Sequence, residues 1–159
     1  MPLSQIHYYF GTKEALMLAL LAYKNEQLLT RQRAMYSRNL PLSKRWELAC
    51  DYLDEDLASG YVRVLQEMMA AGWSSPAIAK AVRKLLSGWF VLLDEVAHEA
   101  ADRHSRIGPF RAGEVAALVG AVFLGAEALL LVGFQEEQIP LRKALRSFGK
   151  MIRSAEEGS

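Results

Sequence analysis

Apolar residues recur every three to four positions along nearly the whole chain, which is the period of an α-helix. No segment alternates convincingly between apolar and polar residues, and no Asn-Gly or Asp-Gly pair marks a hairpin. The pattern therefore predicts an all-α fold. Breaks rich in Pro, Gly, Ser and Asn separate about seven helices, expected over residues 3–10, 13–36, 44–58, 61–72, 76–104, 114–133 and 141–154.

Side chains at the expected helix starts support several of these boundaries. Thr12 and Ser43 each precede an apolar-periodic segment, and their hydroxyl groups can accept a hydrogen bond from a free backbone N–H. Both are predicted N-caps. Ser75 is a third predicted cap, and Pro76 suits the first position of the helix that follows it.

The segment from Val115 to Phe134 holds twenty residues and one charge, Glu127. Its length would span a bilayer. However, a carboxylate at the middle of a membrane costs roughly 2.5 kcal/mol or more, and no aromatic belt flanks the segment. We therefore expect no membrane contact, but a helix buried on all sides in a bundle or a dimer interface.

The composition indicates one compact domain in a reducing compartment. The 159 residues are 52% hydrophobic, which is enough for a sizeable core. Cys50 is the single cysteine, so the chain cannot form an internal disulfide. No basic end followed by an apolar run marks a signal peptide, and we expect a cytoplasmic protein.

Charge is distributed unevenly along the chain. Residues 1–45 contain seven Lys and Arg against two Glu, while the remainder carries a net charge of −4. A basic front on an acidic body is consistent with an end that faces nucleic acid, although an ordinary solvated helix face has the same composition.

The opening stretch, residues 2–16, is aromatic and weakly basic, and a glycine separates its short helix from the next. It resembles the end of the DNA-binding domain in the TetR family of bacterial repressors. The shared pattern is a recognition helix, a tyrosine-rich end, Phe, a small turn and Lys-Glu-x-Leu. The matching residues are Ser4, Ile6, Tyr8, Tyr9, Phe10, Lys13, Glu14, Ala15 and Leu16. Family members carry two more helices before this point.

The resemblance implies a TetR-like helical bundle that lacks the first two helices of the helix-turn-helix domain. Residues 1–12 would be the remnant of that domain, and residues 13–159 would form a ligand-binding and dimerisation domain. The implied function is a transcriptional repressor that binds operator DNA as a dimer and releases it when a small molecule binds. The alternative is a dimeric, ligand-binding helical protein that has lost DNA binding through truncation.

The candidate DNA contacts lie in the opening stretch. Ser and Gln can read base edges, whereas Tyr and Lys can hold phosphates without reading sequence. The candidates are Ser4, Gln5, His7, Tyr8, Tyr9 and Lys13. In the family, the positions of Tyr8 and Lys13 contact phosphate. The competing interpretation is that Tyr8 and Tyr9 pack against the next helix. Operator binding is expected if the upstream helices are present, because a two-turn helix needs tertiary support.

A small-molecule pocket is expected among the middle helices, where polarisable and aromatic side chains accompany a few polar groups. Its candidates are Tyr61, Met68, Met69, Trp73, Trp89, Phe90, Phe123 and Glu127. The expected effector is an apolar or amphipathic small molecule. The competing interpretation is that these are ordinary core residues.

A second copy of the chain is the expected protein partner. The resemblance implies that the last two helices pair with those of the other subunit as a four-helix bundle, and a self-complementary interface of this kind is usual. The candidate interface residues are Leu118, Val122, Gly125, Leu129, Leu145, Phe148 and Ile152. The competing interpretation is that a single subunit buries the apolar helix completely.

No residue constellation argues for catalysis, and we expect no enzyme activity, no cofactor and no metal. The fragment from His98 to His104 is similar to a broken His-Glu-x-x-His zinc motif, but Asp102 stands where the second His belongs. We interpret it as a solvated helix end. Cys50 lies on an apolar helix face and is interpreted as a core residue.

Overall fold

The computed structural model describes residues 12–37, 39–104 and 109–158. These residues form six helices and no strand, which confirms the all-α prediction for this part of the chain. The helix expected over residues 3–10 lies outside the described residues. The observed helices are α2 (Lys13–Tyr36), α3 (Leu42–Ala58), α4 (Tyr61–Gly72), α5 (Pro76–His104), α6 (Ala112–Val132) and α7 (Leu141–Glu157).

Two of the three predicted N-caps are confirmed. The Thr12 hydroxyl accepts a hydrogen bond from the Ala15 N–H at 3.1 Å. The Ser75 hydroxyl accepts one from the Ile78 N–H at 3.4 Å, and α5 begins at Pro76 as expected. Local hydroxyl capping therefore decides where α2 and α5 begin.

The prediction that Ser43 caps α3 is wrong. The helix begins at Leu42, and a carboxylate from the end of α7 takes the place of the cap. Glu156 Oε1 accepts from the Leu42 N–H at 2.5 Å, and Oε2 accepts from the Ser43 hydroxyl at 2.6 Å. A carboxylate is favourable at a helix N-terminus because the N–H groups there carry partial positive charge. α7 also runs to Glu157, about one turn beyond its expected end.

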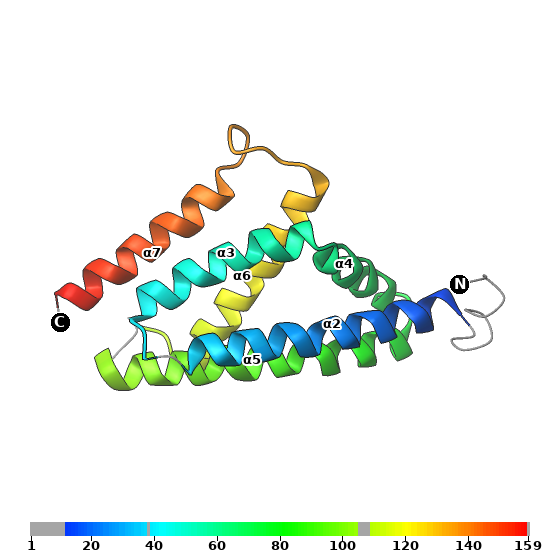
Figure 1. Cartoon of the computed structure of the whole chain (residues 1–159), viewed down its shortest axis with the longest axis horizontal. Helices are drawn as coiled ribbons and strands as arrows, with labels where there is room; N and C mark the ends of the chain where they lie inside the picture. The colour runs from blue at the N-terminus through cyan, green and yellow to red at the C-terminus, as the bar shows by residue number, and fades with distance from the viewer. Residues whose placement is uncertain (1–11, 38, 105–108, 159) are drawn as a thin grey trace.

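Figure 1 shows the arrangement of the helices, and all six of them line a common cavity. α2 and α5 lie side by side along one side of the molecule, and α7 lies on the opposite side against α3. α6 packs mainly on α5, and α4 contacts α2, α3, α5 and α6. This arrangement leaves the ends of α2, α3 and α7 as walls of a common cavity.

Two buried clusters hold the walls together. The first joins α2, α4 and α5 through Leu21, Tyr61, Val62, Leu65, Met68 and Val82. The second joins α3, α6 and α7 through Cys50, Leu53, Phe123, Ala126 and Leu145. Cys50 is thus a core residue as predicted, and burial raises the pKa of its thiol to about 11.

The apolar helix α6 is only partly covered by its own subunit. It is long and apolar enough to cross a membrane by length and composition, a property that core helices of soluble proteins share, and 22% of its most apolar window is buried. Leu118 and Val122 are about half exposed, and Val132 is 79% exposed. The interpretation that one subunit buries this helix completely is therefore wrong, because no other described helix packs on this face.

Candidate ligand cavity

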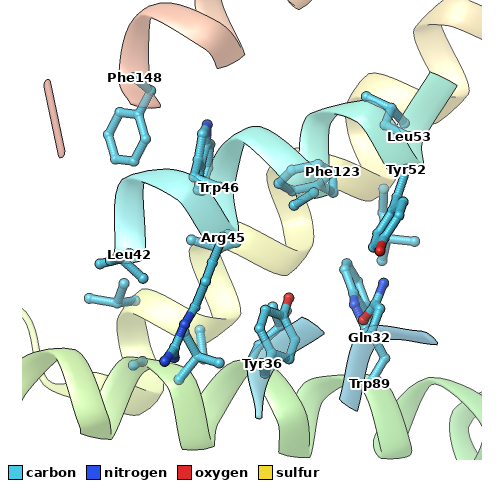
Figure 2. Close-up of a pocket in the computed structure, with 18 of the residues that line it drawn as sticks. Gln32, Tyr36, Leu42, Arg45, Trp46, Tyr52, Leu53, Trp89, Phe123 and Phe148 are labelled. Atoms are coloured by element: carbon cyan, nitrogen blue, oxygen red, sulfur yellow. The ribbon is translucent and has the colours of Figure 1, made fainter. Parts of the chain in front are cut away.

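A cavity of about 470 Å³ lies between the helices, and all six contribute to its lining (Figure 2). Small-molecule sites in proteins span about 300–1,000 Å³, so this volume suits one ligand of moderate size. Most of the lining is apolar and aromatic. Its principal apolar residues are Leu28, Trp46, Leu53, Leu65, Leu86, Trp89, Leu93, Val119, Phe123 and Ile152.

Trp46 of α3 forms the wall where α3, α6 and α7 meet. Its ring packs edge-on against Phe123 with centroids 5.5 Å apart, and against Phe148 at 4.8 Å. The indole N–H donates to the Leu145 carbonyl at 2.7 Å. A side chain on Gly149 would meet the ring, since its Cβ would lie 2.8 Å from Trp46 Cδ1. Glycine at this position lets α7 approach the tryptophan closely.

A polar group lies at the α4 end of the cavity. The Tyr61 hydroxyl donates to Asn25 Oδ1 at 3.2 Å, and the Asn25 amide donates to the Leu85 carbonyl at 3.4 Å. Burial raises the pKa of Tyr61, and the charge of Glu127, which lies in the same region on α6, adds to the rise. These contacts place three polar side chains from α2, α4 and α6 at one end of a mostly apolar chamber.

Glu127 is a largely buried carboxyl group that has no cationic partner among the described residues. Its Oε2 accepts a long hydrogen bond of 3.4 Å from Gln66, whose amide also donates to the Leu124 carbonyl. No Lys, Arg or His of the described part of the chain lies within ion-pair distance. Burial raises the pKa of Glu127 to about 7, although the hydrogen bond from Gln66 opposes the rise and Asp56 adds to it.

Asp56 is the second acid at this end, and it is already paired. Arg31 of α2 donates to Asp56 Oδ2 at 2.6 Å and to Glu55 at 3.2 Å, and its guanidinium lies 4.0 Å from the centroid of the Tyr52 ring. Burial still raises the pKa of Asp56 despite this pairing. The two acids at this end therefore differ: Arg31 compensates the charge of Asp56, whereas no cation of the described residues compensates the charge of Glu127.

Glu127→Gln is expected to alter stability in a pH-dependent way. The folded pKa lies above the ordinary value of 4.5, so protonation favours the folded state at low pH, and this contribution is lost as the pH rises through about 7. At pH 8 the buried charge should destabilise the wild type by about 3 kcal/mol at most. Urea unfolding at pH 5 and pH 8 measures this effect. The free energy of unfolding of the variant, relative to that of the wild type, should be higher at pH 8 than at pH 5. An equal difference at both pH values would contradict it.

The opposite end of the cavity is built around a buried arginine. Arg45 is 5% exposed and extends from α3 toward α5, where its guanidinium donates to both oxygens of Glu99 at 2.7 and 3.1 Å (Figure 2). Tyr36 of α2 lies nearby, and burial raises its pKa to about 12. Arg45 thus joins α3 to α5 at the cavity wall.

One face of α2 lines the cavity along the second half of the helix. Asn25, Leu28, Gln32 and Tyr36 share this face at helical spacing. The Gln32 side-chain oxygen is buried and has no hydrogen-bond partner among the described residues. Figure 2 shows Gln32 close to Tyr52 and Trp89, so a polar acceptor faces an aromatic part of the wall.

Four of the eight predicted pocket residues line the cavity, namely Tyr61, Trp89, Phe123 and Glu127. The other four do not. Met68 is buried in the α2–α4–α5 cluster and Met69 packs against it, whereas Trp73 is 86% exposed where α4 ends. Phe90 faces α6 instead: a Cβ on Gly120 would lie 2.4 Å from its ring.

The sequence interpretation missed Asn25, Gln32, Arg45 and Trp46. A usable signal existed for Asn25, because it is a polar residue between Leu21 and Leu29 on the buried side of a helix. Arg45 had no such signal: it was counted with the basic front of the chain. Both Arg31 and Arg45 instead form ion pairs inside the subunit, which removes two cations from that front.

The predicted interface residues fall into two groups. Leu118, Val122 and Gly125 lie on the exposed face of α6, with Leu129 half-buried one turn further. Leu145 is buried inside the subunit, contrary to the prediction, because α7 turns it toward Cys50 and Phe123. Phe148 and Ile152 line the cavity, although Phe148 is also 43% exposed.

Of the candidate DNA contacts, Lys13 is exposed in the first turn of α2. Ser4, Gln5, His7, Tyr8 and Tyr9 lie outside the described residues.

Within the described ranges, no group of three His, Cys, Asp or Glu could hold a metal ion. His98 Nδ1 donates to the backbone carbonyl of Asp94 at 2.9 Å, and Glu99 binds Arg45. Comparison of the chain with protein-family models, curated proteins and solved structures finds no match.

Proposed function

We propose that the chain belongs to a TetR-like, ligand-responsive transcriptional regulator that acts as a homodimer and represses by binding operator DNA. The observation that carries the proposal is the face that α2 turns to the cavity. This helix begins at Lys13, within the stretch of residues 2–16 that resembles the end of the DNA-binding domain. Its residues Asn25, Leu28, Gln32 and Tyr36 line the chamber. A ligand in the chamber would therefore contact the same helix that follows the DNA-facing stretch.

The mechanism is a two-state switch. A ligand that fits the cavity better in one position of α2 favours that position, in proportion to the difference in its affinity for the two states. Movement of α2 in both subunits changes the separation of the two DNA-contacting ends, and operator affinity falls. Binding is reciprocal, so operator DNA weakens ligand binding by the same factor.

The outer face of α6 supports self-association. Leu118, Val122, Gly125 and Leu129 follow one another at helical spacing, and nothing lies within 4 Å of a Cβ built on Gly125. A long apolar stripe without a charge is costly to expose to water, whereas a second copy would cover it with an identical stripe.

Val122→Lys is expected to convert a dimer into a monomer, weakening self-association at least about 100-fold, because a charge at an apolar interface loses its hydration. Sedimentation velocity across a concentration series measures the change. The control is Val91→Lys, the same substitution at a valine of α5 that is 56% exposed. A wild-type chain that sediments as a monomer at all concentrations would refute the dimer.

Operator binding is tested by gel shift with DNA from upstream of the chain's own reading frame, against a scrambled fragment of equal length. A chain extended upstream by two in-frame helices should bind more tightly than residues 1–159. Equal binding by both would refute the role assigned to those helices. The alternative function, a dimeric ligand-binding protein without DNA binding, predicts no shift with either chain while ligand binding persists.

A further inference from the structure

We propose that the cavity selects monocationic amphiphiles, with an ammonium-type headgroup at Glu127 and an apolar body along the aromatic wall. The inference rests on the proposed ligand-binding function and names the chemical class of its ligand. Glu127 carries it: this carboxyl lines the cavity, and no cation of the described residues pairs with it.

The surroundings of Glu127 favour a cation over an anion. The acids at this end are Glu127 and Asp56, and the hydroxyl of Tyr61 and the amide of Asn25 already bond to each other. The nearby cation, Arg31, is held by Asp56 and Glu55. An anionic headgroup would meet an uncompensated carboxylate, whereas a cationic one would neutralise it. A buried carboxylate gains most from a partner of opposite charge.

Aromatic rings extend the cation site into the apolar chamber. Phe123 precedes Glu127 by four residues and therefore shares its face of α6, and Trp89 packs against the same cluster. Ring faces attract ammonium groups, most strongly when the site is desolvated. The part of the chamber toward Leu28, Leu93 and Val119 is apolar and suits an alkyl or aryl tail, and Arg45 lies at the opposite end of the cavity.

The pH dependence follows from the same groups. Because the pKa of Glu127 is raised to about 7, the carboxyl is mostly protonated at pH 6 and mostly ionised at pH 8. The other titratable groups that face it are Asp56 of α3 and Tyr61 of α4, with Arg31 of α2 behind Asp56. The cavity residues of α5 are apolar. Affinity for a permanent cation should therefore rise about tenfold from pH 6 to pH 8.

The test compares three probes with the same ten-carbon tail: decyltrimethylammonium, decanol and decanoate. Trp46 and Trp89 line the cavity, so their fluorescence reports occupancy in a Trp73→Phe background that removes the exposed tryptophan. At pH 8 the cation should bind at least about ten times more tightly than decanol, and decanoate should bind most weakly. From pH 6 to pH 8 the cation affinity should rise, the decanoate affinity should fall, and the decanol affinity should stay unchanged, because only the charged probes respond to the ionisation of Glu127.

Glu127→Gln should lose at least about tenfold in cation affinity at pH 8 while decanol affinity changes less than about twofold. The control is Glu67→Gln, an exposed acid of α4. Cation binding no tighter than decanol binding, or unchanged by Glu127→Gln, overturns the cation class but leaves a ligand cavity. If none of the three probes binds saturably, both the cation class and the proposed ligand-binding function are overturned.

Discussion

Replacement of Trp46 by alanine is expected to lower the free energy of unfolding by about 3–4 kcal/mol, the range for truncating a large packed aromatic. The side chain packs on Phe123 of α6 and Phe148 of α7, and its N–H donates to the Leu145 carbonyl. Its loss would merge its own volume with the neighbouring cavity. α7 would then lose the ring contact and the hydrogen bond that attach it to Trp46 of α3.

The ion pairs between α3 and α7 cannot replace this attachment. These pairs are Arg142 with Asp54, Arg146 with Asp51 and Arg153 with Glu47, and their side chains are 35–51% exposed. Exposed pairs contribute about 0–1 kcal/mol each, and salt screens them. We therefore expect the tryptophan, rather than the visible charges, to hold α7 in place.

Chemical denaturation of three variants tests this ranking. Trp46→Phe keeps a ring but loses the hydrogen bond, and should cost about 1 kcal/mol. Trp73→Ala removes a tryptophan that is 86% exposed and should change stability by less than about 0.5 kcal/mol. A Trp46→Ala variant as stable as Trp73→Ala would show that α7 does not depend on this contact.

Glu99→Ala is expected to destabilise the fold by about 3 kcal/mol, because it removes the carboxylate that accepts two hydrogen bonds from a buried guanidinium. Replacement of the other partner, Arg45, should cost less stability. In Arg45→Met the new side chain fills much of the same volume, and Glu99, whose side chain is 38% exposed, stays in contact with water. We expect a loss of about 1 kcal/mol for that variant, since a partly exposed carboxylate keeps most of its hydration.

This difference between the two variants is expected for an ion pair with one buried partner, here Arg45, and not for a pair on the surface. Glu95→Ala is the matched control, since Glu95 is an exposed acid on the same helix and should matter by less than about 0.5 kcal/mol. Thermal and urea unfolding measure all three variants. Equal losses for Glu99→Ala and Arg45→Met would contradict the account.

Much of the architecture was predictable from local signals. The ends of α2, α4 and α5 agree with the apolar periodicity and with Thr12, Ser75 and Pro76, because these signals act within a few residues of the chain. The start of α3 was not predictable in the same way. Its cap comes from Glu156, more than a hundred residues later, and no local pattern contains that contact.

The candidate site shows the same division. Tyr61, Phe123 and Glu127 were predictable because a polar or aromatic residue stands out in an apolar segment. Met68 and Phe90 stand in equally apolar segments, but their side chains pack against neighbouring helices. Whether such a side chain joins the core or lines the cavity depends on how each helix is rotated against its neighbours.

The sequence by itself determined that the described chain is helical, where most of its helices begin and end, and that one apolar helix carries a lone carboxylate. Those properties depend on hydrogen bonds and periodicity within single segments. Only the tertiary structure decided that Arg45 joins α3 to α5 and that Trp46 holds α7. It also decided that Glu127 lines a chamber and pairs with no cation of the described residues. Such properties depend on which side chains from distant segments fill the same space, and the packing of whole helices settles that.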